Sequence, residues 1–130
     1  MSRLGSSDGT TTLETTLMIV VLLPVLFAIL EFGDAFHRWL AQDAATAQAA
    51  RFAAEVGGDT PEVRALLASA LRDAGIDPAR AEVQITPSRV GWREPIHVQV
   101  RTDLPVSVPF AFSAVLPLRS SAVTRGELAR

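Results

Sequence analysis

The acidic residue Glu14 stands just before a strongly apolar stretch, and it is the most unusual charge placement in the chain. It follows Gly9 and a short uncharged spacer, and the apolar run of residues 17–30 begins soon after it. A carboxylate inside the start of an apolar helix has to find a partner or remain hydrated. The stretch therefore predicts an acid that is either partnered or hydrated. A helix cap is the alternative, because Thr11 and Glu14 have the spacing of a capping box, although a cap does not account for Gly9.

The other residues with chemical potential do not form a catalytic or metal-binding set. The histidines His37 and His97 lie far apart in the sequence, without a second ligand at metal spacing. Ser120 and Ser121 lack the glycines of a nucleophile elbow, and there is no cysteine. Isolated acids, which are expected on solvent faces, are Glu82, Glu94, Asp103 and Glu127. We therefore predict no enzymatic activity, no cofactor, no metal and no small-molecule substrate.

Composition and charge limit the number of domains and the kinds of partner that the protein can have. The chain has 130 residues, which is room for one domain and an anchor. Its net charge is -2 and its arginines are scattered, so charge gives no support to a nucleic-acid surface.

The chain before Glu14 begins with residues 1–9, which are polar and rich in Gly and Ser. This composition predicts a leader or a disordered tail. The apolar run extends with its flanks to residues 13–33, roughly 30 Å of helix, which is about one hydrocarbon thickness. We expect a transmembrane segment at residues 10–33, kinked but not broken at Pro24. A cleaved secretory signal is the alternative, but Arg3 is the only basic residue before the run and no typical cleavage site follows closely.

The helical pattern continues beyond residue 33, so one long helix is expected over about residues 12–56. Its outer part, residues 34–58, is an Ala-rich extension that ends at a Gly57-Gly58 hinge. We expect this helix to be too long for a small domain to cover. Its small side chains allow close approach by other helices, although alanine also simply favours helix.

Residues 59–130 predict a small α+β domain. Thr60-Pro61-Glu62 is a helix start, and an apolar stripe continues from Val63 to Gly75. Alternating residues 81–86 and 96–104 predict an antiparallel hairpin, and residues 118–128 predict a third strand. Pro105 and Pro109 place Val106, Val108 and Phe110 at an edge of the sheet or beyond it. Residues 110–116 are expected to form a short helical turn. The expected fold is one further helix on a roughly three-stranded antiparallel sheet.

The arrangement resembles the N-terminus of a prepilin-like protein, and more narrowly the TadE-like minor pseudopilins of tight-adherence (Tad, Flp-type, type IVc) pilus systems. Gly9 followed by Thr10-Thr-Thr-Leu-Glu14 is similar to the prepilin-peptidase signature of a glycine before the cut and a glutamate at the fifth mature position. The apolar run closes in Glu31-Phe32-Gly33, similar to the E-F-G of the family, and the chain finishes in a late Arg125-Gly126-Glu127. The sequence departs from the usual pattern of the family in three ways. The residues after Glu14 differ, Pro24 comes later than the usual proline, and two cysteines often found in relatives are absent.

The resemblance implies a structural subunit without enzymatic activity. A prepilin peptidase would cut between Gly9 and Thr10, and Glu14 would pair with the new ammonium in its own or a neighbouring subunit. Glu14 and Glu31 are the expected register and assembly residues. The implied location is the bacterial inner membrane, with a cytoplasmic N-terminus, a periplasmic domain of residues 59–130, and possible incorporation into a pilus. Implied partners are other Tad pilins, the peptidase, inner-membrane platform proteins and the lipid bilayer. An uncleaved single-pass envelope protein with a binding domain is the alternative.

Overall fold

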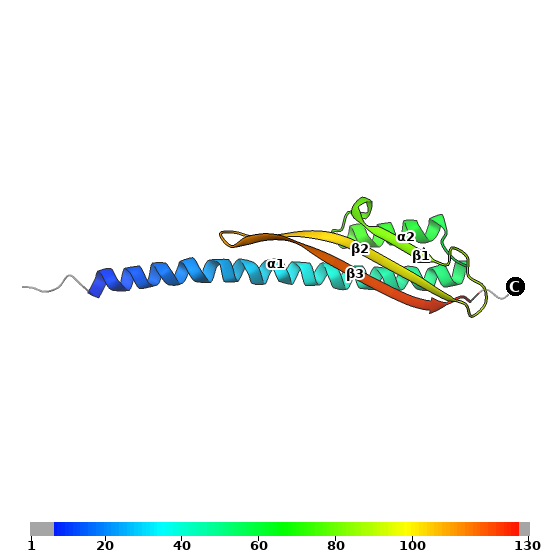
Figure 1. Cartoon of the computed structure of the whole chain (residues 1–130), viewed down its shortest axis with the longest axis horizontal. Helices are drawn as coiled ribbons and strands as arrows, with labels where there is room; N and C mark the ends of the chain where they lie inside the picture. Colours follow the sequence, from blue (N-terminus) through cyan, green and yellow to red (C-terminus); the bar gives the residue numbers. More distant parts are fainter. Residues whose placement is uncertain (1–6, 128–130) are drawn as a thin grey trace, which may run out of the picture.

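A single helix, α1 (Ser7–Val56), forms the long axis of the molecule, and the other elements lie along one side of it (Figure 1). The computed structural model describes residues 7–127. At 1.5 Å per residue, the 50 residues of α1 extend about 75 Å. The helix continues through Pro24 without a break, as predicted.

The start of α1 differs from the expectation from sequence. The helix begins at Ser7, so Gly9, Thr10 and Thr11 are inside it and Thr11 is not its N-cap. The capping-box interpretation of Thr11 and Glu14 is therefore wrong. Residues 1–6 of the expected leader lie outside the described residues.

Two glycines end α1, as predicted. The backbone N–H groups of Gly57 and Gly58 donate to the carbonyl of Ala53, at 3.0 and 2.8 Å, and Gly57 has a φ of 88°. The same two residues also contact the loop of residues 87–94. Val90 donates to the Gly57 carbonyl at 3.0 Å, and Gly58 forms an isolated bridge with Arg89. The end of α1 is therefore held against the domain by backbone hydrogen bonds.

The second helix, α2 (Pro61–Asp73), follows immediately and has the predicted start. The Thr60 side chain accepts a hydrogen bond from the Val63 N–H, and proline occupies the first helical position. Hydrogen bonds from its own backbone and from Thr60 lower the pKa of Glu62. Val63, Leu67 and Leu71 form the buried face of this helix.

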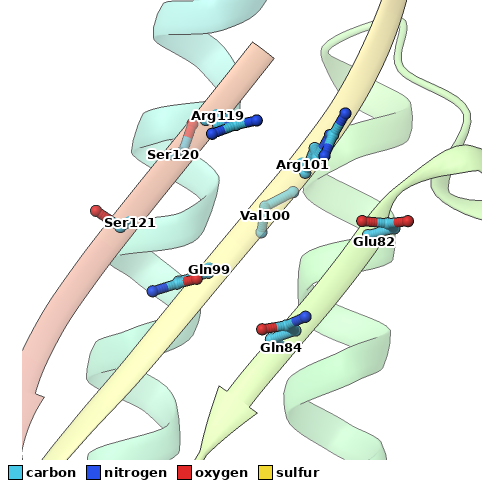
Figure 2. A pocket seen from close by; sticks show the side chains of 8 residues that line it. All are labelled: Glu82, Gln84, Gln99, Val100, Arg101, Arg119, Ser120 and Ser121. Atoms are coloured by element: carbon cyan, nitrogen blue, oxygen red, sulfur yellow. The ribbon is translucent and has the colours of Figure 1, made fainter. Parts of the chain in front are cut away.

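The predicted α+β fold is confirmed. After the short 3-10 helix η1 (Pro78–Arg80), the strands β1 (Glu82–Thr86), β2 (Pro95–Val108) and β3 (Phe112–Arg125) form an antiparallel sheet in the order β1-β2-β3. Both helices lie behind this sheet in Figure 2 and cover one of its faces, while the alternate residues of β2 that face away from the helices are exposed. Alternate residues of β2 are buried, including Ile96, Val98 and Val100.

The β2–β3 hairpin is longer than the sequence indicated. Residues 110–116 were expected to form a helical turn, but β2 continues to Val108 and β3 begins at Phe112, so that expectation is wrong. Pro105 pairs with Val115 in the register of these strands, beyond Arg101, where the pairing with β1 stops. The outer edge of β2 has no partner strand there, so the missing N–H of Pro105 removes no bond to β1.

The Ala-rich face of α1 is covered by its own domain. Ala45, Ala49, Ala50, Ala53 and Ala54 are buried in one core with residues of α2, β1 and β2. The domain covers only this part of α1, and the large apolar side chains of residues 13–30 stay exposed, so the expectation that the whole helix is too long for a small domain to cover is confirmed. The five alanines themselves are buried within the chain and are not available to other subunits. The small side chains let the sheet and α2 approach the α1 backbone closely.

Candidate functional site

The N-terminal half of α1 presents a long apolar surface that the chain does not bury. We call residues 13–30 of α1 the exposed apolar segment. Its large apolar side chains, from Leu13 and Leu17 to Ile29 and Leu30, are exposed. Within the described residues, α1 is long and apolar enough to cross a membrane, and its most apolar window is entirely unburied. An apolar surface of this size is expected to be covered by lipid or by other protein chains.

Gly9 lies in the first turns of α1, and its lack of a side chain is not required by packing. A Cβ atom built on Gly9 meets nothing within 4 Å, and its backbone is helical. Glycine costs about 1 kcal/mol relative to alanine in a helix interior. The fold of the single chain therefore supplies no reason for a glycine at this position. The bond between Gly9 and Thr10 lies one to two turns from the Glu14 backbone, on the same helix.

Glu14 has no cationic partner in the described part of the chain. Its side chain is exposed, and no ion pair or hydrogen bond joins it to another of residues 7–127. The sequence from position 4 to position 36 contains no basic residue, so the stretch around Glu14 cannot supply a countercharge. The nearby hydroxyl of Thr16 donates to the Thr12 carbonyl at 2.8 Å and is not directed to the acid. Within residues 7–127, Glu14 is therefore an exposed acid without a neighbouring cation.

Glu31, the second acid predicted to act in assembly, lies at the opposite end of the exposed apolar segment. It is half-buried, and it has no ion pair within residues 7–127. The 17-residue separation from Glu14 corresponds to about 25 Å along the helix and places the two acids on different faces. They do not form one site in a single chain. They mark the two ends of a segment about as long as a bilayer core is thick.

The junction between the exposed apolar segment and the folded domain is fixed by Arg38. Its Nε donates to Asp34 Oδ2 at 2.7 Å, and its Nη1 donates to the Gly75 carbonyl oxygen at 2.6 Å. Gly75 follows the end of α2, where free carbonyl groups and the helix dipole favour a cation. This contact ties α1 to α2 just after the segment ends.

Gln42 is a positioning residue that the sequence analysis missed. It is completely buried, and its Nε2 lies 3.1 Å from the Val100 carbonyl, 3.3 Å from the Leu118 carbonyl and 3.2 Å from Ser120 Oγ. One turn earlier, Trp39 Nε1 donates to the Arg119 carbonyl at 3.1 Å. These bonds attach α1 to the central strand and to β3. The signal that could have identified it is a long polar side chain on a helix face made mostly of small residues.

The open face of the sheet carries a shallow polar hollow, shown in Figure 2. Glu82, Gln84, Gln99, Arg101, Arg119 and Ser121 line it, with Val100 and Ser120 on the covered side. Arg101 and Arg119 are directly paired across β2 and β3, with Glu82 paired to Arg101 on the other side. No histidine or cysteine lines it, and the Ser120 hydroxyl accepts from Gln42. The hollow therefore lacks a base to activate a serine.

The remaining candidates stay apart in the structure. His37 lies on α1 and His97 on β2, and both are exposed. Within residues 7–127, no group of three or more histidine, cysteine or acidic side chains could hold a metal ion.

Comparison with known protein families places the N-terminal part of the chain. Residues 9–51 match the model of the family described as TadE-like protein. The matched region covers α1 from Gly9 through the exposed apolar segment to the buried alanine face, and it stops before the sheet. No curated protein and no solved structure matches the chain.

Proposed function

Because this chain belongs to the TadE-like protein family, by the match over residues 9–51, we propose that it is a minor pseudopilin of a Tad-type pilus or secretion machine. The observation that carries the proposal is the division of α1. One face of its C-terminal half is buried by the chain's own domain, while the exposed apolar segment is left for lipid and for other subunits. The family consists of pilin-like structural proteins, so the proposed role is assembly without catalysis.

In the proposed arrangement α1 crosses the inner membrane through residues 10–33, with residues 1–9 as a cytoplasmic leader. The domain of residues 59–130, together with the covered part of α1, lies on the periplasmic side. The exposed apolar segment then contacts the lipid bilayer before assembly and other Tad pilins or pseudopilins within it. Inner-membrane platform proteins would meet the chain near this segment.

Processing between Gly9 and Thr10 gives a physical role to the isolated acid. The cut would leave an ammonium on Thr10, four residues and about 6 Å along the helix axis from Glu14. The ammonium of the same chain or of a neighbouring subunit would offset the cost of a carboxylate near apolar surroundings. The absence of a basic residue between positions 4 and 36 supports a partner of this kind.

The alternative function is an uncleaved single-pass envelope protein whose domain binds a partner. One observation favours it: α1 begins at Ser7, so the bond after Gly9 lies inside a helix in the intact chain. A peptidase would have to unwind the first turn before cutting, and terminal turns open readily.

The two functions are separated by the intact mass of the membrane-extracted chain, produced with and without a prepilin peptidase. The proposal expects loss of residues 1–9 only when the peptidase is present. An unprocessed chain in both samples would support the alternative, and a chain beginning beyond residue 33 would instead indicate a secretory signal.

A further inference from the structure

The turn between β2 and β3 presents an apolar side chain that the fold of the chain does not need. We call residues 108–115 the hairpin tip. Phe110 at its centre is 96% exposed and has a φ of 64°, in the left-handed region that costs a non-glycine residue roughly 1 kcal/mol or more. Neither core packing nor backbone conformation favours phenylalanine at this position. Phe112 and Val115 beside it are also exposed.

The surroundings of Phe110 are free of charge. Residues 104–118 contain no acidic or basic side chain, and the nearest charges on the hairpin are Asp103 and Arg119. The two hydroxyl groups of this region, on Ser107 and Ser113, are hydrogen bonded to each other at 3.1 Å. A polar group that is already paired costs less to remove from water. The tip is therefore suited to an environment less polar than water.

The hairpin tip lies beside the end of the exposed apolar segment of α1. The rings of Phe112 and Phe32 are in contact, with centroids 6.4 Å apart. Figure 1 shows the β2–β3 turn reaching back along α1 toward its N-terminal half. Phe32 directly follows Glu31, where the segment closes. The tip thus lies beside the end of the segment that α1 would carry through a bilayer.

We propose that the hairpin tip inserts Phe110 into the interfacial layer of the membrane that α1 crosses, on the side of the folded domain. This inference rests on the proposed function, because it requires α1 to be the membrane anchor. Continuity between the tip and the exposed apolar segment identifies lipid as the occupant. The outer edge of β2 beyond Arg101 has no partner strand, and unpaired strand edges are excluded from the hydrocarbon core. Insertion is therefore limited to the interface.

This second contact with the membrane would fix the orientation of the domain relative to the bilayer. α1 alone would anchor the domain at one point, whereas α1 and the hairpin tip together hold it at two. The open face of the sheet would then keep one orientation relative to the membrane before the subunit is assembled.

The test uses the full chain in vesicles of phosphatidylethanolamine and phosphatidylglycerol, with quencher phospholipids that carry a nitroxide near the headgroup. The chain has no cysteine, so a single introduced cysteine can carry a bimane fluorophore. The probe positions are Ala111→Cys in the tip, Leu17→Cys in the exposed apolar segment and Val123→Cys on the same strand far from the tip. The Ala111→Cys chain is also prepared with Phe110→Ser.

The inference expects quenching at Leu17→Cys and at Ala111→Cys, none at Val123→Cys, and loss of the Ala111→Cys quenching when Phe110→Ser is added. Quenching at Leu17→Cys without quenching at Ala111→Cys would overturn the inference and leave the membrane anchor intact. A blue-shifted but unquenched probe at Ala111→Cys would indicate a protein neighbour, which also overturns it. Absence of quenching at Leu17→Cys would overturn the anchor and the inference with it.

Discussion

The Nε2 atom of Gln42, completely buried in α1, lies 3.1 Å from the carbonyl oxygen of Val100 in the central strand. This bond, with those to Leu118 and Ser120, joins the long helix to the sheet at the point where the exposed half of the molecule gives way to the folded half. We expect Gln42→Ala to lower the free energy of unfolding by about 2–4 kcal/mol, because it removes buried hydrogen bonds and opens a cavity. Thermal unfolding of the full chain in detergent, followed by circular dichroism, measures the change.

The matched control for that prediction is Gln48→Ala, on the exposed face of the same helix. A surface substitution of this kind is expected to change stability by less than about 0.5 kcal/mol. Equal effects of the two substitutions would contradict the anchoring role of Gln42.

The second prediction concerns Gly126, which follows β3. A Cβ atom there would collide with the carbonyl oxygen of Gly91, while the Gly126 N–H donates to the Glu94 carbonyl at 2.9 Å. We expect Gly126→Ala to destabilise the domain by about 1–3 kcal/mol through this overpacking. Gly33→Ala is the control, because nothing lies within 4 Å of its Cβ, and it should be neutral or slightly stabilising. An unchanged free energy of unfolding for Gly126→Ala in the same assay would contradict this prediction, because it would show that the loop containing Gly91 can move to accommodate the methyl group.

Local signals in the sequence predicted the elements whose boundaries have local causes. Thr60 and Pro61 fix the start of α2, Gly57 ends α1, and alternating residues define β1 and the first part of β2. The length of the β2–β3 hairpin was not predictable in this way. Pro105 interrupts the strand pattern, and its tolerance depends on β1 stopping opposite Arg101, which is a property of the register.

Burial of the alanine face of α1 by the chain's own domain could not be predicted from the sequence either. An Ala-rich helix face is compatible with any close partner, and only the fold shows that the partner is the chain's own sheet and α2. Of the candidate site residues, Gly9, Thr10, Glu14 and Glu31 could be named from their types and spacing. The roles of these residues stay predictions, because they depend on a peptidase and on neighbouring subunits, which are separate molecules.

The third prediction concerns processing at Gly9. The structure gives room for a methyl group there, so Gly9→Ala should leave the helix intact and favour it by about 0.5–1 kcal/mol. We nevertheless expect the substitution to prevent peptidase cleavage, because the glycine would be read by the enzyme rather than by the fold. The mass of the chain coproduced with a prepilin peptidase is the measurement. Gly33→Ala, an equally uncrowded glycine in the same helix, should be cleaved normally; cleavage of both would count against Gly9 as the recognition residue.

The fourth prediction separates the charge of Glu14 from processing. Glu14→Gln keeps the size of the side chain and removes its charge, so cleavage should continue. Loss of pairing with the Thr10 ammonium should lower incorporation into the assembled complex by roughly tenfold, which corresponds to about 1.4 kcal/mol. Quantitative immunoblotting of purified assemblies measures this. Glu55→Gln, an exposed acid in the domain half of α1, is the control, and equal incorporation of both variants with the wild type would refute the register role.

The most direct measurement of the central claim is site-specific photo-crosslinking in cells that carry the complete Tad machinery. A photoreactive residue is placed at Leu22, exposed in the middle of the apolar segment, or at Gln99, on the open face of the sheet. We predict adducts between position 22 and another pilin or pseudopilin, formed only when the prepilin peptidase is present. Adducts from position 99 with none from position 22, whether or not the peptidase is present, would contradict assembly through α1 and support a membrane-anchored binding protein.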